Sequence, residues 1–273
     1  MVQAATLPEA YPEASFRPLD GAVEIAVAEA AARLEPRPAK VTALLAAAYA
    51  AVGHVPATPA AVRRLCSAGR EWLVHRAAIR FARADGWFVT DCAHCGAPFD
   101  LHVPVASLPR SAPGPGFPVT RVETKLGVRH FETPNGAHEE AFAVMATADP
   151  RRAFAGLCGL EPDAAEAAAR FDTDDLALID AALEALSPDV ADSVDATCPE
   201  CGAANAARLD PFAFAFPAPA TVLEDVHRIA GAYGWGEADI LALPSDRRRS
   251  YVRLIRRDRP TVVGRGSTRG QLQ

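Results

Sequence analysis

The sequence contains no run of about 18 consecutive apolar residues, the length that a helix needs to cross a bilayer, although 50% of its residues are hydrophobic. Its first residues also lack the basic flank and apolar stretch of a secretory signal peptide. We therefore expect a cytoplasmic protein without a membrane partner. A chain of 273 residues is long enough to bury a substantial core in one large domain or two small ones.

Sequence signatures of catalysis are missing as well. There is no HExxH motif, nucleophile elbow, Walker loop or dinucleotide fingerprint. Gly231, Gly234 and Gly236 interrupt a helical pattern instead of following a strand, so they do not form a cofactor-binding loop. The histidines show no spacing typical of metal ligands. We therefore predict that the protein is not an enzyme.

Cysteine is scarce, but four of the six cysteines form two Cys-x-x-Cys pairs, each followed directly by glycine. Two residues between the thiols let both sulfur atoms reach one ion from a tight turn, and the glycine accepts the backbone conformation of that turn. Two such pairs complete a tetrahedral set of thiolate ligands, which predicts one structural Zn²⁺ ion per chain. The predicted ligands are Cys92, Cys95, Cys198 and Cys201.

Two other interpretations of these cysteines are a dithiol redox site and inert thiols. A redox pair normally lies beside a helix N-terminus, and neither pair is followed by a convincing helical pattern. His94 lies between the first two cysteines, where we expect its side chain to point outward and not to bind the ion. Cys66 and Cys158 lie in apolar helical surroundings and are predicted to be core residues.

The two halves of the chain show a similar plan. The stretch from Phe16 through Asp20-Gly21 to Glu24 has the same internal spacing as the stretch from Phe131 through Asn135-Gly136 to Glu139. Each stretch precedes a helical region that ends at one cysteine pair. The 102 residues between the pairs must loop out and return, which costs about 1 kcal/mol more than closing a 20-residue loop. We therefore predict two pseudo-repeated halves that meet at one zinc-ribbon-like site.

The predicted fold class is α+β and mostly helical. Helical patterns cover 39–52 and 59–84, short strands are expected at 87–90 and 99–105, and alternating Phe212, Phe214 and Phe216 predict another strand. Proline and glycine at other places mark breaks between the parts. The predicted parts are a disordered tail (1–15), the first repeat with its zinc knuckle (16–105), a Pro/Gly linker (106–118), the second repeat with its knuckle (119–216), a C-terminal helical hairpin (217–258) and a basic disordered tail (259–273).

Charge is distributed unevenly along the chain. The stretch 245–273 has nine arginines against two aspartates, a net charge of +7, which leaves −13 for the remainder. Within the predicted hairpin, Val222, Val226, Ile229 and Tyr233 are spaced at steps of 4, 3 and 4 and form one face of a helix, which Gly234 is placed to end. The last helix is expected to turn its arginines toward water.

This C-terminal sequence, from Val226 through Tyr233-Gly234-Trp235 to Pro244 and on through the arginines to Ile255, resembles a known family. It is similar to the baseplate hub assembly chaperones of contractile-tailed phages and of phage-like contractile injection systems. Those relatives also carry a CPxCG element, as in 198–202, and an LPTG-like segment to which 133–136 roughly corresponds. Gly236 departs from the pattern, which usually has a helix-capping serine there, so the cap is weaker.

The resemblance implies a non-enzymatic role in assembling a baseplate, with baseplate or spike proteins as partners, either in the cytoplasm or within a phage-like particle. Tyr233 and Trp235 either pack the turn or form an exposed anchor for such a partner. The predicted partner-binding residues are Tyr233, Trp235, Arg248, Arg249 and Arg253.

Two other classes of protein are consistent with the same features. A zinc-ribbon nucleic-acid-binding protein would use the arginine-rich end for phosphate contacts, but the acidic remainder would repel a polyanion. A thiol-based redox chaperone would use the cysteine pairs in exchange reactions. Because the acidic remainder would repel a polyanion, we expect that nucleic acid is not the partner.

Overall fold

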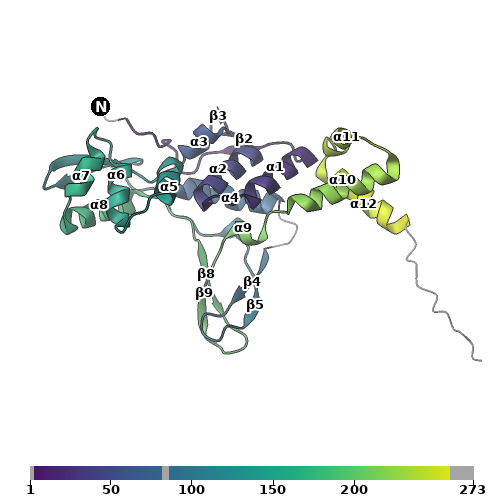
Figure 1. Ribbon diagram of the computed structural model, residues 1–273. Coiled ribbons are helices and arrows are strands. Elements are labelled where there is room, and N and C mark those ends of the chain that lie inside the picture. The colour runs from purple at the N-terminus through teal and green to yellow at the C-terminus, as the bar shows by residue number, and fades with distance from the viewer. Residues whose placement is uncertain (1–2, 82–85, 259–273) are drawn as a thin grey trace, which may run out of the picture.

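The computed structural model describes residues 3–81 and 86–258. Its helices form an elongated row of three groups, and two β-hairpins project from the middle of that row (Figure 1). About 48% of the chain is helical and the sheets are small and antiparallel, which confirms the predicted α+β class.

The middle group packs four helices against a three-stranded sheet. Asp20 caps the first helix by accepting a hydrogen bond from the Val23 amide, and Thr58 caps the third, which Pro59 opens. Leu44, Leu45 and Leu73 form part of its fully buried core. The elements are β1 (Ala14–Phe16), α1 (Gly21–Ala32), α2 (Arg37–Ala48), β2 (Tyr49–Val52), β3 (Val55–Pro56), α3 (Pro59–Arg63) and α4 (Ser67–Phe81), with sheet order β1-β2-β3.

The second group packs one β-hairpin against helices at one end of the row (Figure 1). Phe131, Phe171 and Ile179 are central to its core. Asp172 begins the longest helix of this group with a reciprocal capping box to Asp175. The elements are β6 (Val119–Thr124), β7 (Gly127–Glu132), α5 (Gly136–Ala143), α6 (Pro150–Cys158), α7 (Ala164–Arg170) and α8 (Thr173–Leu186).

The third group lies at the opposite end of the row and has a small core of its own (Figure 1). It consists of α10 (Pro219–Tyr233), α11 (Glu237–Leu241) and α12 (Ser245–Asp258). Gly234 ends α10 in the left-handed conformation, with φ at +71°, as its position in the sequence suggests. α12 packs against α10, and both helices contact α1 of the middle group.

The two projecting hairpins complete the described structure, and we call them together the hairpin arm. Each hairpin pairs two antiparallel strands of five residues. The first follows α4 and the second follows α8, so each lies after a helical group in the chain. They consist of β4 (Trp87–Asp91) and β5 (Pro98–His102), and of β8 (Ser193–Thr197) and β9 (Ala204–Arg208); η1 (Val105–Ser107) and α9 (Pro211–Phe214) are the short helical turns that follow them.

Several sequence-based expectations were wrong in detail. Residues 3–15 are not a disordered tail, because Thr6 and Ala10 are buried and Thr6 donates a backbone hydrogen bond to the Glu132 carboxylate at 2.8 Å. The segment 39–52 is a helix only to Ala48 and then becomes β2.

The expected strand at Phe212–Phe216 is also wrong, because this segment contains the helical turn α9. Asp210 accepts a hydrogen bond from the Phe212 amide and Pro211 occupies the first helical position, so local capping overrides the alternating pattern. The linker 106–118 contains no strand, and Gly114 donates a backbone hydrogen bond to Leu186 at 2.9 Å. The predicted basic tail, 259–273, lies outside the described residues.

Candidate metal centre

The hairpin arm brings both cysteine pairs together at the turns of its hairpins. The four Sγ atoms all lie within 4.8 Å of one another, so they form a group that could hold a metal ion. Cys92 Sγ lies 3.7 Å from Cys201 Sγ, and Cys95 Sγ lies 3.8 Å from Cys198 Sγ. A tetrahedron with metal–sulfur bonds of about 2.3 Å requires sulfur atoms about 3.8 Å apart. The spacing therefore fits a four-thiolate metal site, and no cysteine is in a disulfide.

The two turns that carry the cysteines have the same backbone geometry. Gly96 donates its amide hydrogen to the Cys92 carbonyl at 2.8 Å, and Gly202 donates to the Cys198 carbonyl at 2.9 Å. Both glycines have φ at +73°, and no atom lies within 4 Å of where a Cβ would be placed. Glycine is thus required by backbone conformation and not by crowding.

Backbone amides of the first turn also favour a thiolate. The Cys95 amide points at Cys92 Sγ from 3.5 Å, and the His94 amide does so from 3.3 Å. The hydrogen bond from Cys95 is the largest influence on the Cys92 thiol and, together with that from His94, lowers its pKa to about 6. Cys92 is therefore prepared to act as a metal ligand near neutral pH.

Asn205 connects the two hairpins beside the cysteines, a role that the sequence analysis missed. Its side-chain oxygen accepts a hydrogen bond from the Ala93 amide of the opposite hairpin at 2.8 Å, and its amide nitrogen donates to the Ala203 carbonyl at 2.9 Å. Asn205 lies in β9, and its polar side chain is buried. Asparagine is disfavoured in strands, and that local conflict was the signal available in the sequence.

The thiol cluster supplies a large share of the small apolar core of the hairpin arm. Cys92 and Cys198 are buried together with Phe99, while Cys95 and Cys201 are exposed. Isolated two-stranded hairpins are marginally stable in water, so a cross-link at the tip would stabilise the arm. Four thiolates would complete a tetrahedral shell around one ion, the arrangement typical of structural zinc sites.

The predicted partner-binding aromatic residues cluster at the turn after α10. Tyr233 stacks on Trp235 with ring centroids 5.3 Å apart, and Trp235 contacts Tyr251 edge to face at 5.1 Å. Tyr233 is nevertheless 42% exposed and Trp235 38% exposed. The rings therefore pack the turn and also leave part of their surface accessible, and their role as an anchor for a partner stays a prediction.

The predicted arginines divide into two kinds. Arg249 is partly exposed and pairs with Asp246 at 2.6 Å, and Arg253 donates to the Ser250 hydroxyl at 2.8 Å. Arg248, however, is 0% exposed and forms an ion pair with Glu24 of α1. Its assignment to a partner surface was therefore wrong, because α12 packs this side of its first turn onto the start of α1.

Cys66 and Cys158 are both buried, and Cys158 has polar neighbours that the sequence did not suggest. Its Sγ lies 3.7 Å from His138 Nδ1, and His138 Nε2 lies 3.4 Å from the Glu132 carboxylate. Burial raises the pKa of the Cys158 thiol to about 12, so the thiol stays protonated. A completely buried, protonated thiol does not act as a nucleophile despite this triad-like order.

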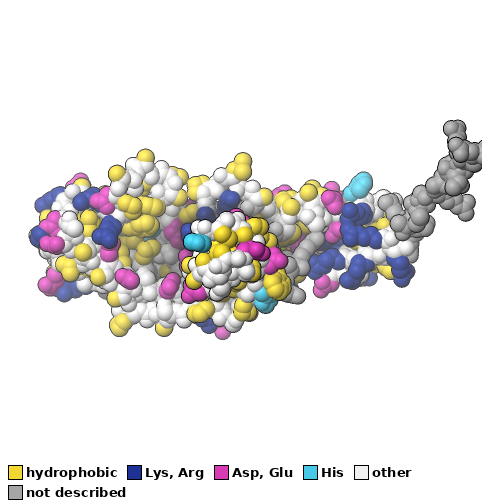
Figure 2. All heavy atoms as spheres, turned by 90° about the horizontal axis from the view of Figure 1, so that it is seen from below, with side chains coloured by type: hydrophobic (Ala, Val, Ile, Leu, Met, Phe, Trp, Pro, Cys, Tyr) yellow, Lys and Arg dark blue, Asp and Glu magenta, His cyan; other side chains and the backbone are white. Residues whose placement is uncertain are grey.

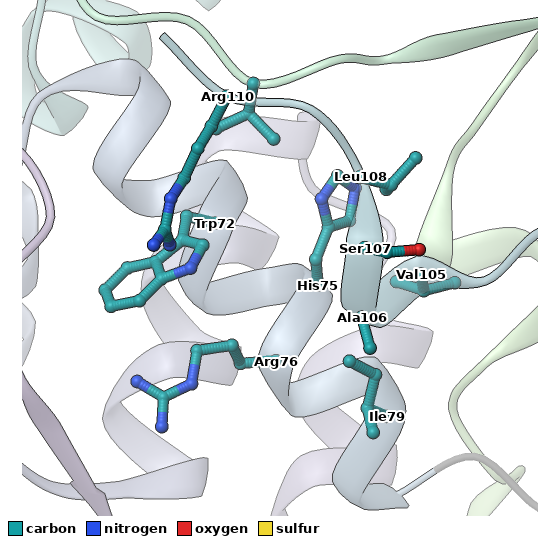
Figure 3. A pocket seen from close by; sticks show the side chains of 10 residues that line it. Trp72, His75, Arg76, Ile79, Val105, Ala106, Ser107, Leu108 and Arg110 are labelled. Atoms are coloured by element: carbon teal, nitrogen blue, oxygen red, sulfur yellow. The ribbon is translucent and has the colours of Figure 1, made fainter. Parts of the chain in front are cut away.

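A separate hollow of about 250 Å³ lies between α4 and the 105–110 segment (Figure 3). The guanidinium groups of Arg76 and Arg110 stack on the Trp72 ring, 4.9 and 5.2 Å from its centroid. The stacking fixes the 105–110 segment on α4. His75 lines the same hollow, and its Nδ1 is buried without a hydrogen-bond partner. The 105–110 segment is remote from α4 in the sequence, so the sequence analysis could not bring the two together.

No helix among the described residues is long and apolar enough to cross a membrane. Comparison of the chain with models of protein families, with curated proteins and with solved structures gave no match.

Proposed function

We propose that the protein is a non-enzymatic assembly or structural protein whose hairpin arm is held together by one structural zinc ion. The observation that carries the proposal is the tetrahedral spacing of four free thiols at the arm's tip. Thiolates select zinc among the common divalent ions, and a bound zinc ion would cross-link two hairpins that are remote in the chain. Cys92, Cys95, Cys198 and Cys201 would be its ligands.

The apparatus that we propose for this protein is the baseplate of a phage-like contractile injection system, with a baseplate or spike protein as partner. The support is the sequence resemblance of 226–255 and of the CPxCG element at 198–202. A closed thiolate site is consistent with that role because it can stabilise a fold without taking part in chemistry.

We propose that the partner binds at the C-terminal group of helices. Tyr233 and Trp235 present accessible ring surface, and Arg249 and Arg253 lie on the same group. Figure 2 shows Lys and Arg side chains gathered over this end of the molecule. Aromatic and arginine side chains are the types most enriched at energetically important positions of protein interfaces.

We further propose that the two halves of the chain are pseudo-repeats. Each half supplies one hairpin with the same cysteine turn, and each has a helix that starts at an Asp-Gly or Asn-Gly pair. Two copies of one module are the simplest origin of two equivalent half-sites for one ion.

Two measurements test the proposed function. Elemental analysis of the purified protein is expected to give one zinc per chain, and Cys198→Ser is expected to abolish it while Cys66→Ala and Cys158→Ala retain it. No zinc, or two ions per chain, would contradict the shared site.

Deletion of the gene in its native host is expected to leave no assembled particles, or particles without a complete baseplate. Normal particles in the deletion strain, combined with tight and salt-sensitive DNA binding by the purified protein, would favour a nucleic-acid-binding protein. Reversible disulfide formation between the cysteine pairs in place of zinc binding would favour a redox chaperone.

A further inference from the structure

The C-terminal group docks on the middle group through the start of α1. Asp20, the N-cap of α1, pairs with Pro244 in an isolated antiparallel bridge. The Ser245 amide donates a hydrogen bond to the Leu19 carbonyl at 3.0 Å. Backbone pairing therefore fixes the register between the start of α12 and the start of α1.

A buried ion pair completes this interface. Arg248 of α12 lies against Gly21 and pairs with Glu24, and both charged residues are buried. A Cβ atom at Gly21 would lie 2.5 Å from Arg248 Nη1 and 3.0 Å from the Leu241 Cα. Glycine is needed here because the arginine and the neighbouring backbone occupy the space of a side chain.

The middle group docks on the second group in the same way. Asn135, the N-cap of α5, pairs with Cys66 in an isolated antiparallel bridge. The Ser67 amide donates a hydrogen bond to the Pro134 carbonyl at 3.0 Å, the same length as its counterpart. The backbone contacts at the starts of α4 and α5 thus repeat those at the starts of α12 and α1.

The arginine–glutamate pair is repeated as well. Arg70 of α4 is buried and pairs through Nε with Glu139, whose side chain is 23% exposed, at 3.0 Å. A Cβ at Gly136 would collide with the Arg70 guanidinium group. In both interfaces, removing the glutamate leaves a buried arginine without its counter-charge.

These equivalent contacts come from equivalent sequence. The docking motif is Leu-x-Ser-x-x-Arg, at 65–70 and again at 243–248, and each copy follows a five-residue helix, α3 or α11. The docked helix start is Asx-Gly-x-x-Glu, at 20–24 and again at 135–139. The group α10–α12 therefore corresponds to α2–α4.

Helices α7 and α8 of the second group lack the contact, and they also lack the arginine of the motif. Phe171 and Thr173 of α7–α8 occupy the leucine and serine positions, but Leu176 stands where arginine is required. The β6–β7 turn covers this place, with the Lys125 amide donating to the Asp175 carboxylate at 3.0 Å. No Asx-Gly helix start docks there within the described residues.

We propose that Leu-x-Ser-x-x-Arg binding to Asx-Gly-x-x-Glu is a portable head-to-tail docking motif, and that the α1 start of a second copy of this chain can bind the C-terminal group in trans. The inference rests on the proposed pseudo-repeat but requires neither zinc nor a baseplate partner. The C-terminal group has its own core and packs mainly on α1. In the intact chain the intramolecular contact is favoured, because a short connection gives an effective concentration of about millimolar.

Complementation between two full-length variants tests this inference. Gly21→Leu removes the docked helix start and leaves the motif at 243–248 intact, whereas Arg248→Glu does the reverse. Each variant alone is expected to be a monomer in light scattering coupled to size exclusion, with faster hydrogen exchange at the Ser245 amide. Mixing the two at about 0.1–1 mM is expected to give a heterodimer of twice the mass.

Gly231→Leu is the matched control, because Gly231 is exposed in α10 and no atom crowds its Cβ position. In this variant the C-terminal group is expected to stay docked on the α1 start of its own chain, so the variant should not form a heterodimer with Gly21→Leu. If the bulky changes unfold the C-terminal group, Glu24→Gln and Arg248→Gln replace them. Unchanged hydrogen exchange at the Ser245 amide in both variants would refute the docking role of the motif. Faster exchange at Ser245 without any heterodimer in the mixture would refute docking in trans.

Discussion

At the scale of single residues, buried polar side chains decide where separate parts of the chain meet. Asn205 joins the hairpins of the arm, and Arg70 and Arg248 each hold a helix start. Such residues are costly to bury without partners, so their contacts specify one arrangement among the many that apolar packing alone would tolerate.

Asn205→Ala is expected to destabilise the protein by about 1–3 kcal/mol, because it leaves the Ala93 amide without its partner beside the cysteine turn. Urea denaturation of the zinc-loaded protein measures the change. Thr197→Ala, at an exposed position in the partner strand, is the matched control. Equal midpoints for the two variants would contradict a bridging role for Asn205.

His75 predicts a pH dependence of stability. Burial lowers the pKa of His75 below its ordinary value of 6.5, so the unfolded chain binds the proton more tightly than the folded chain. The stability that His75 contributes is therefore complete above about pH 6.5 and falls as the pH drops from there, by at most about 1.4 kcal/mol per pH unit. His75→Gln is expected to reduce this slope in denaturant titrations between pH 7.5 and 5, and the exposed His54→Gln is the surface control.

At the scale of elements, contacts at helix starts and hairpin turns determine how the elements are placed against one another. α4 and α12 each present an arginine from the first turn to the start of another helix. The cysteine turns of the two hairpins share the same φ at glycine and the same backbone hydrogen bond. Short terminal segments with defined backbone geometry thus determine how longer elements are placed.

The arginines of α12 are expected to respond differently to charge reversal. Arg253→Glu should weaken partner binding most at low salt without loss of stability, and Arg249→Glu should weaken binding with a small loss of stability, since Arg249 reaches the surface but also lies 3.4 Å from Glu24. Arg248→Glu should place two carboxylates together in a buried site and loosen the C-terminal group even without a partner. Binding titrations at two salt concentrations, together with thermal unfolding, separate the two effects. Equal loss of stability in all three variants would contradict the assignment.

Trp235→Ala is expected to lower both partner affinity and stability, because the ring is stacked on Tyr233 and Tyr251 yet partly exposed. The stability loss should be modest, about 1 kcal/mol for the lost aromatic contacts. Calorimetric titration with the partner and thermal unfolding measure the two losses. The exposed Leu223→Ala in α10 is the control for a general loss of surface apolar area.

At the scale of the whole molecule, three helical groups in a row support one projecting arm (Figure 1). The helical groups have separate cores, and the thiol cluster belongs to neither of the two large ones. The elongated arrangement therefore separates the candidate metal centre from the C-terminal surface proposed for partner binding.

Removal of the metal with a chelator is expected to increase hydrogen exchange mainly in β4–β5 and β8–β9. The helical groups should keep their protection because their cores contain none of the four ligands. Hydrogen–deuterium exchange with mass spectrometry, before and after readdition of zinc, measures this. Uniform loss of protection throughout the helices would show that the metal supports the whole fold.

The sequence alone determined the α+β class, the four thiols that come together and the glycines that shape their turns. The fold class and the two cysteine turns depend on residues close together in the chain, where periodicity and Cys-x-x-Cys-Gly spacing act directly, whereas the meeting of the two pairs followed from the four ligands that one ion requires. Only the tertiary structure decided the burial of Arg248, the bridge made by Asn205 and the order in residues 3–15. Each of these depends on a contact between segments far apart in the chain, and a one-dimensional pattern cannot distinguish an arginine that faces water from one that meets a distant glutamate.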